Sequence, residues 1–127
     1  NRGYRLLGNT AEIVAHPIAG IGVQEDKLKK DPELIKRVIR ATLRALQLLQ
    51  TNPKDTVKIL MDWTRANEKD ALRSLDLAKP GFSKNGLITD DDLSIEWSFI
   101  QQQTKKTHVP VSVALDMTLL KEVQREF

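Results

Sequence analysis

Residues 31–50 read DPELIKRVIRATLRALQLLQ, and this stretch decides the fold class. Asp31 is a favourable N-cap residue, and Pro32 at the first helical position loses no useful hydrogen-bond donor. Beyond them, apolar and small side chains recur at the three- and four-residue spacing of one helix face. The sequence therefore predicts an amphipathic helix over residues 32–50, whose inner stripe consists of Leu34, Ile35, Val38, Ile39, Thr42, Leu46 and Leu49.

The signals for helix starts continue along the chain. Asn52-Pro53 repeats the combination of cap and proline, and it predicts a second helix over residues 53–63. Polar cap residues ahead of apolar periodic runs predict three further helices, which begin after Asn67, Thr89 and Asp116. Because the connections are short, we expect neighbouring helices to pack against one another.

The first 23 residues differ from the rest. Short apolar and β-branched runs occur at Tyr4–Leu7, at Ile13-Val14 and at Ile18–Val23, and Gly20 and Gly22 in the last run disfavour a helix. We expect one or two short strands here, with the two glycines packed closely in a buried strand. The predicted fold class is mostly α with one or two short N-terminal strands, in a single domain divided into a strand segment (1–23) and a helical segment (24–127).

Composition excludes several function classes. The 127 residues include 20 Lys or Arg, 17 Asp or Glu and no cysteine, which excludes disulfides, thiolate metal sites and a cysteine nucleophile. No apolar run approaches the length that a membrane span needs. Basic residues gather between Lys27 and Arg44, but no aromatic residue accompanies them, so we expect no nucleic-acid partner.

The residues that carry chemistry do not form a recognisable catalytic or metal site. Ser112, His108 and Asp116 have the residue types of a hydrolase triad, but no nucleophile-elbow pattern accompanies them. Asp90–Asp92 are contiguous, so their side chains diverge on a helix, and capping explains them better than a cation. We therefore expect no catalytic residue, no metal ligand and no cofactor, and a protein that is not an enzyme.

One surface feature allows an interaction role. Lys36, Arg40 and Arg44 share one row of the long helix and are candidates for docking an acidic partner. A stand-alone helical protein-interaction module that uses this basic face is one possible function, and a solvated helix surface is the simpler interpretation of the same row. The aromatic residues at apolar helical positions are expected in the core, namely Trp63, Phe82, Trp97 and Phe99.

The order of these segments resembles a known family. An apolar run at Gly20–Val23, a polar turn, and Lys29–Arg37 are followed by Asn52–Asp55, by the loop Phe82–Thr89, and by Val109-Pro110 with Leu115–Leu120. This ordered set is similar to the C-terminal part of the substrate-binding proteins of ABC transporters, in the nitrate, sulfonate, taurine and thiamine-precursor class. The resemblance extends over nearly the whole chain.

The resemblance implies a piece of a two-lobed α/β (type II) periplasmic binding protein. Such a protein captures an oxyanion, a sulfonate or a small organic solute outside the cytoplasm and delivers it to an ABC permease. Most ligand contacts would lie in an upstream part, and the uncovered apolar faces of this piece would favour a homodimer through its N-terminal strands. The crossover between lobes implies a hinge at Ala15, His16, Pro17, Ile18, Ala19 and Gly20.

Overall fold

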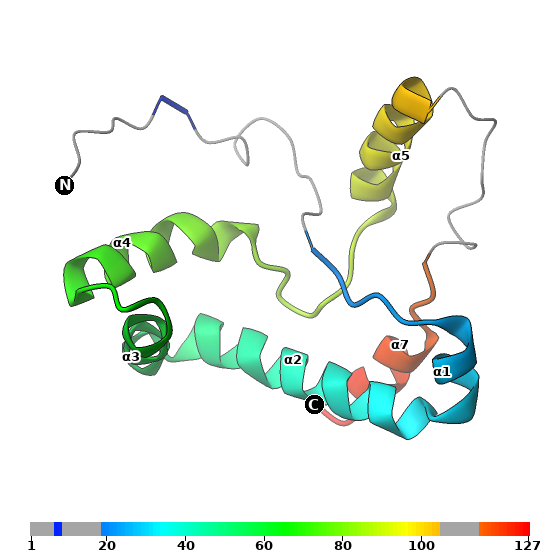
Figure 1. Ribbon diagram of the computed structural model, residues 1–127, viewed down its shortest axis with the longest axis horizontal. Coiled ribbons are helices and arrows are strands. Elements are labelled where there is room, and N and C mark those ends of the chain that lie inside the picture. The colour runs from blue at the N-terminus through cyan, green and yellow to red at the C-terminus, as the bar shows by residue number, and fades with distance from the viewer. Residues whose placement is uncertain (1–6, 9–18, 105–114) are drawn as a thin grey trace.

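The computed structural model describes residues 7–8, 19–104 and 115–127, and it is mostly helical, as the sequence predicts. Figure 1 shows α2 as the long central rod, with α3 and α4 at one end and α1 and α7 at the other. The helices are α1 (Glu25–Lys30), α2 (Pro32–Thr51), α3 (Pro53–Thr64), α4 (Glu68–Ala78), the 3₁₀ turn η2 (Lys79–Gly81), α5 (Asp90–Thr104) and α7 (Thr118–Gln124).

The helix starts confirm four of the five capping predictions, and the fifth is wrong, because the N-cap of α7 is Met117 and not Asp116. The side chains of Asp31 and Asn52 each accept a hydrogen bond 3.1 Å long from the amide three residues ahead, at the starts of α2 and α3. Asn67 does the same for α4 at 2.9 Å, and the Thr89 hydroxyl accepts the Asp92 amide at 3.1 Å. These bonds satisfy amide donors that the first turn of a helix leaves unpaired. Local sequence therefore determines where these four helices begin.

The strand prediction is wrong for the part of it that the structure describes. Residues 19–23 are exposed and form no strand, while Tyr4–Leu6, Ile13-Val14 and Ile18 lie outside the described residues. A Cβ at Gly20 or Gly22 would meet no atom within 4 Å, so the expected close packing is absent there. An extended segment becomes a strand only when a neighbour completes its ladder of hydrogen bonds, and no described segment does so.

A short helix, α1, lies where the family resemblance has a polar turn, within the segment 24–127 that the sequence predicts to be helical. In α1, Lys29 pairs with Glu25 at 2.6 Å and Lys30 pairs with Asp26 at 3.3 Å. Both pairs have the spacing of four residues that brings side chains together on a helix. This charge pattern is visible in the sequence and explains why a segment without buried residues is helical.

Two separate apolar clusters pack against the two halves of α2. Near α7, the cluster contains Val123, which is fully buried, and three residues spaced four apart on α2, namely Ile35, Ile39 and Leu43. Between α3 and α4, the cluster contains Val57, Ala71 and Leu75, with Leu49 of α2 packed against it. Within the described part of the chain, α2 is thus the element that connects the two clusters.

The prediction of a core role is wrong for three of the four aromatic residues. Trp63 is 82% exposed on α3, and Phe82 and Phe99 are 43% and 55% exposed. Trp97 is partly buried, and its indole nitrogen lacks a hydrogen-bond partner among the described residues. Helical spacing identified one face correctly on α2, but it could not indicate which faces other elements cover.

No helix in the described residues combines the length and apolar character that crossing a membrane requires.

Candidate interaction surfaces

The basic row of α2 is divided by its contacts with α7. The Lys36 ammonium lies 2.8 Å from Glu122 and 3.3 Å from Glu33. Arg40 donates two hydrogen bonds to the carboxylate of Glu126, at 2.6 and 2.7 Å. Both cations therefore contribute to the seam between α2 and α7.

The protonation equilibria reflect this pairing. The hydrogen bonds that Lys36 donates to Glu122 and, second, to Glu33 raise the pKa of Lys36, while the hydrogen bond from Arg40 lowers the pKa of Glu126. Glu126 in turn raises the pKa of Arg40. All these shifts favour the charged forms, as expected where opposite charges lie within hydrogen-bond distance.

Arg44, the third residue of the row, is exposed and forms no ion pair within the part of the chain that the structure describes. Lys36 and Arg40 lie within reach of Glu122 and Glu126, whereas Arg44 lies one turn further along α2. Sequence reasoning could not find this division, because Arg40 and Glu126 are 86 residues apart.

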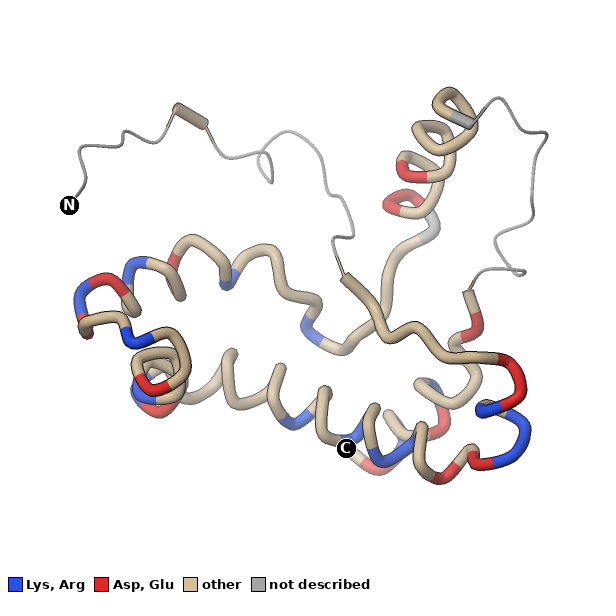
Figure 2. Tube along the Cα trace, in the orientation of Figure 1, with Lys and Arg blue, Asp and Glu red and all other residues tan. Residues whose placement is uncertain are grey.

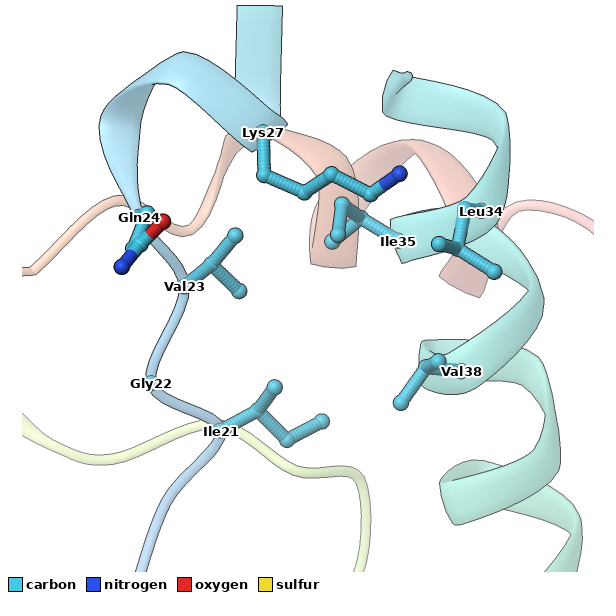
Figure 3. A pocket seen from close by; sticks show the side chains of 8 residues that line it. All are labelled: Ile21, Gly22, Val23, Gln24, Lys27, Leu34, Ile35 and Val38. Atoms are coloured by element: carbon cyan, nitrogen blue, oxygen red, sulfur yellow. The ribbon is translucent and has the colours of Figure 1, made fainter. Parts of the chain in front are cut away.

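A cavity of about 350 Å³ lies between the extended segment 21–24 and the first half of α2. In Figure 3, Ile21 and Val23 face Leu34, Ile35 and Val38 across it. The lining is mainly apolar and also includes Gly22, Gln24 and Lys27. We call these eight residues the α2 groove.

Cations border the α2 groove. Lys27 lies at its edge, where its ammonium pairs with Asp31 at 3.0 Å. Arg37 follows Leu34 by three residues and directly precedes Val38, so it lies beside these two groove residues on α2. It forms no ion pair among the described residues. Figure 2 shows Lys and Arg interspersed with Asp and Glu at this end of the molecule. The groove can thus receive an apolar segment that carries negative charge.

The sequence analysis missed the α2 groove. It assigned Leu34 and Val38 to the inner stripe of the helix, but Val38 is 42% exposed. The two residues are spaced four apart at one edge of the apolar face, beside Arg37. The sequence therefore contains a signal for the groove: the apolar face of α2 is wider than one neighbouring helix can cover.

The loop between η2 and α5 is fixed to the body of the molecule. Gln124 of α7 donates a hydrogen bond of 2.7 Å to the carbonyl of Asn85. Gly86 adopts a φ of 79°, and a Cβ there would lie 3.3 Å from a methyl carbon of Leu43. These contacts set the point from which α5 leaves the body (Figure 1).

α5 presents apolar side chains to solvent. Ile95, Phe99 and Ile100 are 46%, 55% and 37% exposed, and Figure 1 shows the helix projecting away from α2. Its predicted stripe of Leu93, Trp97 and Ile100 is only partly buried. Within the described residues, the helix therefore carries an apolar surface that is only partly covered.

The remaining site residues fall mostly outside the described chain. Of the triad types, Ser112 and His108 lie outside, and Asp116 accepts a hydrogen bond of 2.8 Å from the Thr118 amide at the start of α7. Of the hinge residues, Ala15, His16, Pro17 and Ile18 lie outside, whereas Ala19 and Gly20 are exposed and irregular. No group of three potential metal ligands occurs among the described residues.

Comparisons with known proteins give no relative: no family model, no curated protein and no solved structure shows a significant match to this chain.

Proposed function

We propose that this chain is the C-terminal helical part of an extracytoplasmic solute-binding protein that serves an ABC transporter. The observation that carries the proposal is the order of its helix starts. An irregular segment over residues 19–24 leads into α1, and Asp31-Pro32 and Asn52-Pro53 then begin two consecutive helices. Both starts are capped by their Asp or Asn side chains, whose acceptors lie 3.1 Å from the capped amides, and the family resemblance includes helix starts of this Asp-Pro and Asn-Pro kind.

The uncovered faces of α3 and α4 add support. Ile59, Trp63, Leu72 and Leu77 are 43–82% exposed on these two helices. In a two-lobed α/β protein, helices cover a sheet and need apolar surface for that contact. Further layers contributed by a longer protein would bury such residues.

The proposed mechanism is capture without covalent chemistry. The intact protein would close its two lobes around a nitrate-like oxyanion, a sulfonate or a small organic solute, with bending at residues 15–20. Amides and helix N-termini of the upstream part would hold the ligand. The helices described here would support one lobe and contribute few ligand contacts.

The rival function, a stand-alone interaction module that docks an acidic partner on Lys36, Arg40 and Arg44, has less support. Carboxylates of the chain itself already neutralise Lys36 and Arg40. Only Arg44 of that row remains exposed for a partner.

Thermal unfolding of the full-length protein that contains this chain tests the proposal. We expect nitrate, taurine, another sulfonate or a thiamine-related pyrimidine to raise its melting temperature. A ligand at a hundred times its Kd stabilises a protein by about 2.7 kcal/mol. The chain of 127 residues alone is the control, and it should not respond. A full-length protein that none of these solutes stabilises would contradict the proposal.

A further inference from the structure

Two apolar surfaces that the described residues leave partly exposed differ in the charges beside them. α5 contains Asp90, Asp91, Asp92 and Glu96 and no Lys or Arg. Between Lys27 and Arg44, five of the seven Lys or Arg pair with carboxylates of the chain, whereas Arg37 and Arg44 of α2 are exposed and form no ion pair among the described residues. Opposite charge beside apolar surface is the pattern by which protein interfaces select partner and orientation.

The shapes of the two surfaces also correspond. Ile95 and Phe99 are spaced four apart, so they lie next to each other on one side of α5. Leu34 and Val38 have the same spacing on α2 and form one wall of the groove, opposite Ile21 and Val23. A row of side chains on one helix packs between the rows of another in this way.

The attachment of α5 favours a second copy as the source of the helix. The loop before α5 is fixed by the Gln124 hydrogen bond, and its Gly86 lies so near Leu43 that a Cβ there would be 3.3 Å from a methyl carbon. From there α5 points away from the α2 of its own chain (Figure 1). A helix of this length is marginally stable in water by itself, so its apolar side chains need a contact surface.

We propose that the chain forms a two-fold dimer in which α5 of each copy lies in the α2 groove of the other. Ile95 and Phe99 enter the groove between Val23 and Val38, and the acidic first turn of α5 lies near Arg37 and Arg44. The two-fold axis makes both contacts identical, so each copy supplies one helix and one groove. This inference does not rest on the transport function proposed above.

Sedimentation velocity of the chain over a range of concentrations and salt tests the dimer. We expect a dimer that dissociates at low concentration and more readily at high salt, because charge contributes to the contact. Phe99→Ser and Val38→Glu should each weaken association at least tenfold. The matched control is Trp63→Ser, which removes the most exposed aromatic side chain of α3 and should leave association unchanged. Circular dichroism verifies that each variant is folded.

Disulfide trapping identifies which surfaces meet. The chain has no cysteine, so introduced thiols react only with each other. A mixture of Val38→Cys and Phe99→Cys chains should form a cross-linked heterodimer on oxidation, and a mixture of Val38→Cys and Trp63→Cys chains should not. The proposal is overturned if the chain is monomeric at all concentrations, if Phe99→Ser leaves the dimer intact, or if a Val38→Cys, Phe99→Cys double variant closes its disulfide within one chain.

Discussion

Arg40 and Glu126 connect the middle of the chain to its last residues through two short hydrogen bonds. A guanidinium that bonds both oxygens of a carboxylate fixes the relative orientation of the two groups. Arg40 is 27% exposed and Glu126 45% exposed at the side chain, so solvent screens the pair, which we expect to orient α7 more than to stabilise it.

The Arg40–Glu126 pair predicts a specific acid sensitivity. The pKa of Glu126 is lower in the folded chain than its ordinary value of 4.5, because Arg40 hydrogen bonds to it. Its stabilising effect is therefore complete above pH 4.5 and is lost as the pH falls through the lowered folded value. Arg40→Gln should reduce the melting temperature at neutral pH slightly and make its decrease in acid shallower. Thermal melts at a series of pH values measure both effects.

Arg44→Gln is the control for this prediction, since it removes the same charge from an exposed position one turn away. It should leave the acid limb of the stability profile nearly unchanged. If the melting temperatures of Arg40→Gln and Arg44→Gln depended on pH in the same way, the Arg40–Glu126 pair would have no influence on folding stability.

Gly86 is required at its position for two reasons, a positive φ of 79° and the nearby side chains of Leu43 and Leu120. A residue with a Cβ in this left-handed conformation costs about 1–2 kcal/mol. Gly86→Ala should therefore lower the free energy of unfolding by at least that amount, measured by urea denaturation. Gly81→Ala is the control, because a Cβ there meets no atom within 4 Å, and it should be close to neutral. Equal effects at the two glycines would contradict the account of this loop.

At the scale of elements, two leucines of α4 differ in how far they are buried. Leu75 is 3% exposed against α3, while Leu72 on the same helix is 43% exposed. Leu75→Ala should reduce the free energy of unfolding by about 2–4 kcal/mol, because it removes buried methyl groups and leaves a cavity. Leu72→Ala should change it by less than about 1 kcal/mol. Chemical denaturation of both variants makes the comparison, and a larger loss for Leu72→Ala would show that α4 packs through another face.

The elements that could be predicted from sequence are those whose signals are local. Asp31, Asn52, Asn67 and Thr89 accept hydrogen bonds from amides three residues ahead, so a short window contains both partners. α1 was missed although its i, i+4 charge pairs are equally local. These charge pairs can be read in the sequence, so α1 could have been predicted.

The surfaces could not be predicted in the same way, because their partners are distant in the sequence. Trp63 has a spacing typical of a core residue, yet the described structure leaves it 82% exposed. Lys36 resembled a free surface cation, but Glu122 lies 2.8 Å from it. Spacing along a helix indicates which residues share a face, and only the tertiary fold decides what covers that face.

At the scale of the whole molecule, the two apolar clusters share no residue, and α2 connects them. Substitutions in independent sites have additive effects to within about 0.5 kcal/mol. The double variant Val123→Ala, Leu75→Ala should therefore lose the sum of the two single losses, as measured by urea denaturation at a concentration at which the chain is monomeric. A coupling above about 1 kcal/mol would show that the clusters form one core.

At the same scale, the exposed apolar surfaces of the described residues lie on different elements: on α3 and α4, on α5, and along the α2 groove. We propose that the outer faces of α3 and α4 cover the sheet of a longer protein, and that the α2 groove and α5 pack together across two copies. The first pairing belongs to the proposed transport function, and the second is a property of this chain alone. Each can fail without the other.

The most direct test of the transport proposal is the nucleotide sequence of the complete reading frame that encodes this chain. We predict that the frame continues upstream of the codon for Asn1 through a first lobe of alternating strands and helices to a secretion signal. An in-frame stop codon followed by a start codon shortly before Asn1 would contradict the proposal.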